Sequence, residues 1–361
     1  MVTVFSRRKL LKGPGTAQIL GQQETGTRRL AHIGYHASHE QFAPRELLRY
    51  IRMAQDAGFV AGMCSDHWSP WSEAQGHSGF AWSWLGAALE ATNMPFGVVT
   101  VPGGWRYHPA LLAQAAATLA QMYPGRLWLA PGSGEWLNEH ITGGSWPDKA
   151  TRNERLYEGV QIMRALWNGE TVSREGPIPT DEARLWTLPH APPQLIGAAL
   201  TPKTARWLGG WADGLITVNQ PEEALQEVID AFREGGGTQK PVYLQVHLSY
   251  ASTEAEAWRN AHEQWRTSVF DSNVLAQLKL TEEFEAAAKY VTQEEMSPSV
   301  RISADTEQHV AWLTEAIEMG INALFLHNVG RNQEEFIDVY GDKVLPRVAG
   351  QDAGGGKYEH P

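Results

Sequence analysis

The chain contains a single cysteine, Cys64, and this scarcity sets the first limits on its chemistry. One cysteine excludes an internal disulfide and any metal site built from several thiolates. Cys64 lies inside a short apolar run, where a buried structural thiol is typical. We therefore look for reactive groups elsewhere in the chain.

Long apolar runs and basic runs are lacking as well. No apolar segment approaches the roughly 18–20 residues of a membrane helix. The longest basic run is Arg7-Arg8-Lys9, and the formal net charge is −11. Nucleic acids and anionic membranes require a basic face. We therefore expect no nucleic-acid partner and no membrane partner, and a small molecule as the substrate.

The first residues are polar and without hydrophobic periodicity, so 1–30 is predicted to be a disordered leader. Ser6 to Lys12 resembles a twin-arginine export signal, but the apolar core that such a signal needs does not follow it. We therefore expect a cytoplasmic protein. Residues 349–361 are predicted to be a flexible tail.

From Ala31 onward, short apolar runs alternate with helical patterns. The predicted strands are Ala31–Ala37, Val60–Ser65, Pro95–Val101, Arg126–Pro131, Pro193–Ala199, Gly214–Val218, Pro241–Ser249 and Ala323–Asn328. The predicted helices are Pro44–Ala57, Pro109–Met122, Asn153–Trp167, Thr201–Trp207, Pro221–Arg233, Asp305–Met319 and Gln333–Val339. Alternating strands and helices pair in parallel, and eight repeats close a (β/α)₈ TIM barrel. A doubly wound sheet is the alternative, but it would show a glycine-rich phosphate fingerprint after the first strand.

Two intervals are too long for simple connections between strands and helices. They are residues 135–192, after the fourth predicted strand, and residues 250–302, after the seventh. Long insertions usually cover a site or form an interface. Neither interval shows a core of its own or a linker, so we expect one domain over residues 31–348.

Reactive side chains follow the predicted strands. The second strand leads into Asp66 and His67, with Trp71 soon after, and the fourth leads into Gly132-Ser-Gly134-Glu135. In a barrel, these strand ends meet at one mouth. Glycine lets a planar ligand approach the backbone. Desolvation beside such a ligand would raise the pKa of Glu135 and suit it to proton transfer.

Each of these residues also has a purely structural interpretation. Glu135 is also placed to cap the helix that follows it, as the lesser of the two interpretations. His36, His39, His77 and His108 are more often packing or hydrogen-bonding groups than ligands. No His-x-x-x-His pair or carboxylate triad stands at ligand spacing, so no metal site is predicted.

Four motifs in fixed order resemble those of luciferase-like oxidoreductases, and most of all the F420-dependent glucose-6-phosphate dehydrogenase subgroup. They are Gly34–Phe42 (GYHASHEQF), Ser65–Trp71 (SDHWSPW), Arg106–Pro109 (RYHP) and Gly132–Glu139 (GSGEWLNE). The resemblance spans roughly Ala31 to Val348. It implies a TIM barrel that binds a flavin or deazaflavin at its mouth and transfers a hydride to or from a small organic substrate. A sugar, an alcohol and a monooxygenase-type substrate are all compatible with it, and we also expect a homodimer.

The resemblance implies roles for individual residues. His67, Glu135, Trp71 and Glu40 would form the catalytic group, with Glu135 as the proton donor or acceptor. The cofactor-binding residues would be Asp66, Val99, Thr100, Gly134, Asn138, Gly197, Ala198 and Thr217. The resemblance also implies a non-proline cis bond within residues 99–101, behind the cofactor ring.

The chain departs from the sugar-phosphate subgroup after its sixth predicted strand. Val218-Asn219-Gln220-Pro221 stands where that subgroup has lysines for the substrate phosphate, so glucose 6-phosphate is not expected. As a whole the chain resembles a branch described as non-F420 flavinoid oxidoreductases. The predicted cofactor is therefore FMN or coenzyme F420, with a slight preference for FMN. Two alternatives are a glycoside hydrolase that uses Asp66 and Glu135 and a non-catalytic flavin-binding protein.

Overall fold

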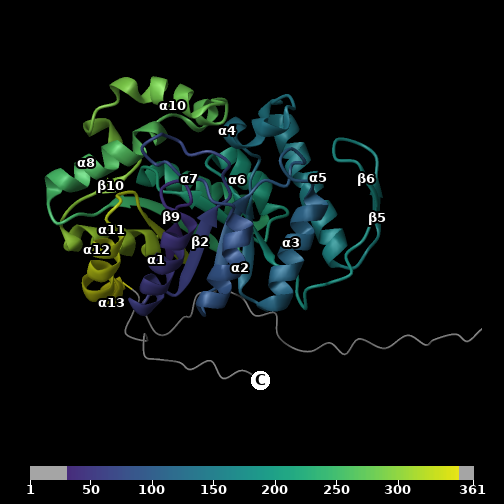
Figure 1. Ribbon diagram of the computed structural model, residues 1–361, viewed down its shortest axis with the longest axis horizontal. Helices are drawn as coiled ribbons and strands as arrows, with labels where there is room; N and C mark the ends of the chain where they lie inside the picture. The colour runs from purple at the N-terminus through teal and green to yellow at the C-terminus, as the bar shows by residue number, and fades with distance from the viewer. Residues whose placement is uncertain (1–30, 349–361) are drawn as a thin grey trace, which may run out of the picture.

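The computed structural model describes residues 31–348, so the predicted leader and tail lie outside the described residues. Its eight main strands form one closed parallel sheet, because β8 pairs with β9 and β11 pairs with β1. Figure 1 shows the helices around this sheet. The strands are β1 His32–Ala37, β2 Ala61–Ser65, β3 Phe96–Thr100, β4 Leu127–Pro131, β7 Gln194–Ala198, β8 Gly214–Val218, β9 Val242–Ser249 and β11 Ala323–Asn328. The predicted (β/α)₈ barrel is confirmed.

The helices that follow these strands are α1 Pro44–Asp56, α2 Ala81–Ala91, α3 Pro109–Met122, α5 Lys149–Trp167, α6 Pro202–Gly209, α7 Glu222–Phe232, α11 Thr306–Glu318 and α12 Gln333–Val339. The sequence prediction missed α2, which is apolar on most of its surface and lacks the polar face that reveals a helical period. It also began α5 at Asn153. The helix starts at Lys149 because the Asp148 side chain accepts a hydrogen bond from the Thr151 N–H at 2.9 Å.

Aromatic rings fill the barrel interior. Trp128 on β4 packs against Tyr243 on β9 and Phe325 on β11, with ring centroids 5.2 and 5.3 Å apart. Glycines make room for these rings: a Cβ on Gly34 would lie 2.5 Å from the Phe325 ring, and one on Gly97 would lie 2.0 Å from Trp128. The interior is thus a packed core, as expected for a barrel of this size.

The next inward-facing layer toward the carboxyl ends of the strands forms the floor of the barrel mouth, because side chains on a strand alternate between two faces. It has two unlike halves. The histidine half consists of His36, His247 and His327 on the adjacent strands β1, β9 and β11. The apolar half consists of Val99, Ala130 and Ala198 on β3, β4 and β7.

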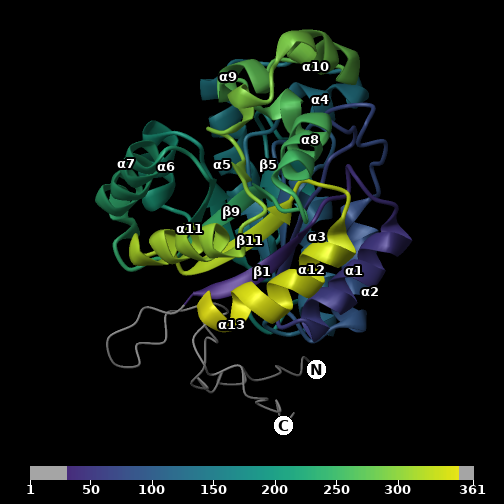
Figure 2. The same ribbon diagram turned by 90° about the vertical axis from the view of Figure 1, so that its left-hand side faces the viewer.

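Both predicted insertions are present. The first contains the short helix α4 (Trp136–Glu139), α5, and an antiparallel hairpin of β5 (Val172–Arg174) and β6 (Thr180–Ala183), which the sequence prediction missed. The second contains α8 (Glu254–Trp265), α9 (Ser272–Leu275), α10 (Thr281–Ala287) and β10 (Arg301–Ile302), which extends the sheet beside β9. Figure 2 shows α4, α8, α9 and α10 gathered at one end of the barrel.

The peptide bonds of β3 differ from the prediction. The cis bond expected within residues 99–101 is wrong: all peptide bonds in the described part of the chain are trans. There β3 keeps regular pairing with β2 and β4, and for a non-proline residue the trans form is favoured by about 3 kcal/mol.

Among residues 31–348, no helix combines the length and the apolar character that spanning a membrane requires.

Candidate active site

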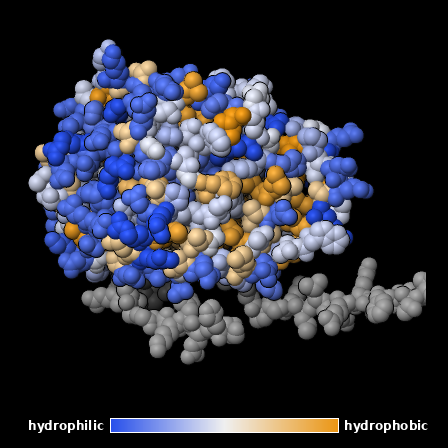
Figure 3. Space-filling model, viewed as in Figure 1, coloured by the Kyte–Doolittle hydropathy of each residue, from blue (hydrophilic) through white to orange (hydrophobic). Residues whose placement is uncertain are grey.

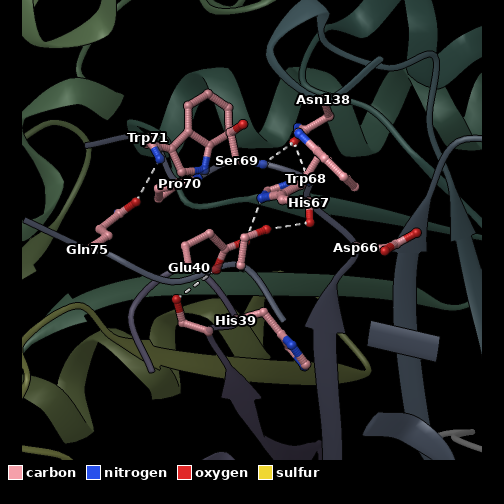
Figure 4. Close-up of polar contacts among 12 residues, drawn as sticks. His39, Glu40, Asp66, His67, Trp68, Ser69, Pro70, Trp71, Gln75 and Asn138 are labelled. Atoms are coloured by element: carbon pink, nitrogen blue, oxygen red, sulfur yellow. Dashed lines mark hydrogen bonds and ion pairs between the residues drawn. The ribbon is translucent and has the colours of Figure 1, made fainter. Parts of the chain in front are cut away.

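A buried ion pair lies at the ends of β1 and β2. His67 Nδ1 is 2.5 Å from Glu40 Oε1, and the other Glu40 oxygen accepts a hydrogen bond from the Ser38 hydroxyl at 2.8 Å (Figure 4). The close contact with His67 is not aligned as a hydrogen bond, so we treat it as an ion pair. The His67 side chain is 17% exposed and that of Glu40 only 3%. The imidazole therefore faces the mouth, and the carboxylate stands behind it.

The charges of this pair support each other. Burial alone would raise the pKa of Glu40, but the charge and close contact of the His67 imidazolium lower that pKa to about 2. Burial alone would lower the pKa of His67, but the Glu40 carboxylate outweighs burial and raises it. The pair is therefore ionised near neutral pH, and His67 holds a proton that it can offer to an oxygen atom in the mouth.

Three hydrogen bonds fix the backbone around His67. The Ser78 hydroxyl donates to the His67 carbonyl at 2.8 Å, and Arg106 donates to the Asp66 carbonyl at 2.5 Å. On the other side, Asn138 Oδ1 accepts from the Trp68 N–H at 2.8 Å (Figure 4). His67 is thus held rigidly although it lies in a loop, as a group that transfers protons must be.

Glu135 lies on the same mouth, at the N-cap position directly before α4. It is half-buried, and burial raises the pKa of its carboxyl above the ordinary value. Its side chain makes no capping hydrogen bond to the helix, and its carboxylate instead accepts from Asn138 Nδ2 at 3.4 Å. This geometry disfavours the interpretation of Glu135 as a helix cap and keeps it available for proton transfer.

Asn138 links the two groups. Its oxygen binds the loop that carries His67, and its nitrogen binds Glu135. The resemblance assigned Asn138 to the cofactor, but both ends of its amide are already engaged by protein. We therefore propose it as a positioning residue.

We expect Asn138→Ala to lower kcat by about tenfold, a barrier increase of about 1.4 kcal/mol, while cofactor affinity changes little. The reason is that His67 and Glu135 lose their shared anchor. Steady-state kinetics and a cofactor titration would test this, with exposed Asn93 as the matched control (Asn93→Ala). A large loss of cofactor affinity with unchanged kcat would instead support direct contact with the cofactor.

A second buried charge cluster lies beside this pair, and the sequence prediction missed it. Arg106 stands between two carboxylates, 3.4 Å from Asp66 and 3.6 Å from Glu139. Tyr107 also donates to Asp66, at 3.3 Å. Burial raises the pKa of Glu139 to about 7 despite the guanidinium. Asp66 is therefore occupied by protein groups and points away from the Glu40–His67 pair (Figure 4).

Trp71 closes one side of the mouth. Its ring packs edge-on against His67 at 5.5 Å and against Phe284 of α10 at 5.1 Å. The second insertion therefore reaches the site and shields the ion pair from water. Trp71, which the resemblance placed in the catalytic group, thus lies beside His67.

Only some of the predicted cofactor residues lie at the floor of the mouth. Val99 and Ala198 belong to the apolar half of the floor, and the buried Thr100 hydroxyl has no hydrogen-bond partner among the described residues. Gly197 faces outward instead, because a Cβ there would lie 2.7 Å from Leu208 of α6. The Thr217 hydroxyl accepts a hydrogen bond from Gln220 at 3.3 Å.

Comparison with known proteins adds to this geometry. Residues 24–323 match the family of luciferase-like monooxygenases, and the chain belongs to that family. It is 34% identical over 325 residues to an F420-dependent glucose-6-phosphate dehydrogenase of Kribbella flavida, an alignment covering 87% of this chain and 97% of the relative. It is 33% identical to the protein of the same name from Beutenbergia cavernae, with 88% and 98% covered.

Solved structures lead to the same class. An F420-dependent secondary alcohol dehydrogenase in complex with an F420–acetone adduct is 30% identical, with a TM-score of 0.83 over 88% of this chain and 99% of that one. A type II Baeyer–Villiger monooxygenase in complex with FMN shares the fold, with a TM-score of 0.66, 16% identity, and 88% and 99% covered. The protein is therefore an oxidoreductase of the luciferase-like class. The glycoside hydrolase alternative is not supported.

Proposed function

We propose that this protein is an F420-dependent oxidoreductase that transfers a hydride to or from a small organic substrate. The observation that carries the proposal is the Glu40–His67 ion pair, whose imidazole faces the same mouth as the Glu135 carboxyl. Hydride transfer between an alcohol and a carbonyl also moves one proton at oxygen. The pKa of His67 is raised by a neighbouring carboxylate and the pKa of Glu135 is raised by burial. An acid and a base of this kind at one mouth suit that proton transfer.

The floor of the mouth fits a planar cofactor. Val99, Ala130 and Ala198 carry short apolar side chains. Gly134, at a φ of 82°, packs instead against Trp146 and Val101, each 3.1 Å from the place of a Cβ. Thr100, the next residue on β3 after Val99, points to the opposite face of the strand and therefore away from this floor. When bound, a flavin or deazaflavin would supply the two-electron hydride chemistry.

Cations stand on the same side as the apolar half. Lys149 Nζ donates to the Ser133 hydroxyl at 2.5 Å, and Arg152 Nε is buried without a hydrogen-bond partner among the described residues. Both coenzyme F420 and FMN carry phosphate, so these two cations would receive the anionic part of either cofactor.

The roles of the protein groups follow from this arrangement. His67 would bind the substrate oxygen and give it a proton during reduction of a carbonyl, or take one back during oxidation of an alcohol. Glu40 would keep the imidazole oriented and charged. Glu135 would exchange a proton at the cofactor side of the mouth, and Trp71 would exclude water.

The experiment that tests the proposal is a titration of the cofactor-free protein with F420 and with FMN in parallel. The relatives favour F420, whereas the sequence alone gave a slight preference for FMN. We expect submicromolar binding of F420 and binding of FMN at least about tenfold weaker, measured by absorbance and fluorescence. Tighter binding of FMN would reverse the choice of cofactor, and binding of neither would contradict the proposed function. Turnover of reduced cofactor with an acceptor would exclude a non-catalytic binding protein.

We also propose a homodimer that forms through α2 and α3. Trp82, Leu111, Ala115 and Leu119 line a groove between these helices, and Leu111 is 61% exposed. Figure 3 shows hydrophobic residues gathered on this face. Exposed apolar patches of this kind usually mark an interface.

Cytoplasmic location remains a prediction.

We expect Leu111→Asp to convert the dimer to a monomer, because it would bury an unpaired carboxylate in an apolar contact. Sedimentation velocity of the variant and of the unmodified protein measures this. Leu188→Asp is the control, since Leu188 is exposed but lies away from the groove. A monomeric unmodified protein would show that the interface assignment is wrong.

A further inference from the structure

The histidine half of the floor has no role in the chemistry described so far. His36 and His327 stack with ring centroids 4.5 Å apart, and His247 lies 5.5 Å from His327. Trp265 of α8 covers them, at 4.6 Å from His327 and 5.0 Å from His247. His36 adjoins the Glu40–His67 pair closely enough for both of those groups to affect its charge. The three rings thus form one wall of the reaction space.

All three rings are neutral at physiological pH. Burial lowers the pKa of His36 to about 3 and that of His247 to about 4, and it also holds the pKa of His327 well below the ordinary value. The three rings therefore offer polar atoms but no charge. Among residues 31–348, no three histidine, cysteine or carboxylate side chains are arranged to hold a metal ion.

The hydrogen bonds determine which nitrogen atoms carry protons. Gln41 Nε2 donates to the Val329 carbonyl at 2.7 Å, so Gln41 Oε1 is the acceptor for His327 Nε2 at 2.9 Å. Gln245 Nε2 can only donate, so His247 Nε2 accepts from it at 3.0 Å.

The proton of His247 therefore resides on Nδ1. This N–H has no hydrogen-bond partner in the described part of the chain, and its ring is half-buried. A neutral donor is thus available at the mouth.

The end of β8 supplies no positive charge on this side. At the end of β8, Asn219 is held by protein. Its side-chain nitrogen donates to the Ser299 carbonyl at 3.1 Å, and its side-chain oxygen accepts from the backbone N–H of His247 at 2.7 Å.

The cations of the second insertion are engaged elsewhere or exposed. Arg266 pairs with Glu285 at 2.6 Å, Lys279 lies over Trp136, Lys289 over Tyr290 and Arg301 over Trp312, and Arg259 is exposed.

We propose that His36, His247 and His327 form the substrate subsite, and that they select an uncharged alcohol and its carbonyl product over a phosphorylated compound. The proposal rests on the proposed function and specifies its substrate class. A neutral imidazole N–H matches a hydroxyl or carbonyl oxygen. A phosphate dianion would lose its hydration against these three rings without gaining a counter-charge from them. The cations Lys149 and Arg152 lie instead on the cofactor side.

The test compares each uncharged compound with its own phosphate ester. The probes are glucose with glucose 6-phosphate and 2-propanol with isopropyl phosphate. Saturation-transfer NMR measures binding to the cofactor-free and the F420-loaded protein. We expect the uncharged member of at least one pair to bind at least about tenfold better than its ester. His247→Lys should raise relative affinity for the ester at least about tenfold, because it adds the missing cation. His190→Lys, at an exposed histidine, should change nothing.

Every result of this test either supports or overturns the histidine subsite. Preference of the unmodified protein for the esters, or binding of no probe, overturns the proposal, as does an unchanged ratio in a folded His247→Lys variant. If that variant fails to fold by circular dichroism, His247→Gln replaces it, and it should weaken binding of the uncharged compound alone. Absence of F420 binding would defeat the proposed function, whereas the probe ratios on the cofactor-free protein would still test the subsite.

Discussion

Glu135→Gln is expected to lower the turnover rate by at least about a hundredfold, roughly 2.7 kcal/mol of barrier, while cofactor affinity stays nearly unchanged. Glutamine keeps the shape of the side chain and its hydrogen-bonding reach toward Asn138, but it cannot exchange a proton. Burial raises the pKa of Glu135, so in the unmodified protein this carboxyl can hold or release a proton closer to neutral pH than an exposed glutamate can. Pre-steady-state kinetics and a cofactor titration measure the two quantities separately.

The melting temperature of the same variant separates catalysis from stability. A helix-capping role predicts full activity and a stability loss of about 1 kcal/mol or less. Because the Glu135 side chain makes no capping hydrogen bond, we expect the melting temperature to stay within about 2 °C. Glu170→Gln, an exposed change far from the mouth, is the control. An active Glu135→Gln protein would remove this residue from the mechanism.

Glu40→Gln is expected to have an effect of similar size for a different reason. It removes the anion that raises the pKa of His67, and burial then lowers that pKa. The imidazole would become neutral at pH 7 and could no longer donate its proton. We expect carbonyl reduction at pH 7 to fall by about a hundredfold, within the usual range for loss of a general acid.

The pH dependence of carbonyl reduction should change in a defined direction. In the unmodified protein, carbonyl reduction should be lost as the pH rises through the raised pKa of His67. In Glu40→Gln, that limb should move to lower pH by at least about one unit, so activity returns only in more acidic solution. Ser38→Ala is the matched control, because it removes one hydrogen bond from Glu40 but keeps the charge. An unmoved limb would mean that Glu40 does not set the charge of His67.

Much of the barrel could be predicted from local patterns. Each strand is a short apolar run bounded by turn residues, and such runs are visible without knowledge of their partners. Helices with one polar face were predicted for the same reason, whereas α2 was missed because it is buried on most sides. The proposed catalytic group comes from motifs near strand ends, since Glu40 and His67 follow within three residues of the ends of β1 and β2.

The properties of the site depended on contacts between distant segments. Closure of the barrel places β11 beside β1, with His32 opposite Ala323, and this brings His36 into contact with His327. The position of Arg106 between Asp66 and Glu139 arises in the same way.

By itself, then, the sequence determined the order of the eight barrel strands and which polar residues follow them, because these depend on neighbours along the chain. Only the tertiary structure decided that the Glu135 side chain makes no capping hydrogen bond, that Asn138 joins it to the His67 loop, and that one half of the floor is neutral histidine. Charge state and hydrogen-bond partner depend on burial and on atoms within a few ångströms, and folding alone brings those atoms together.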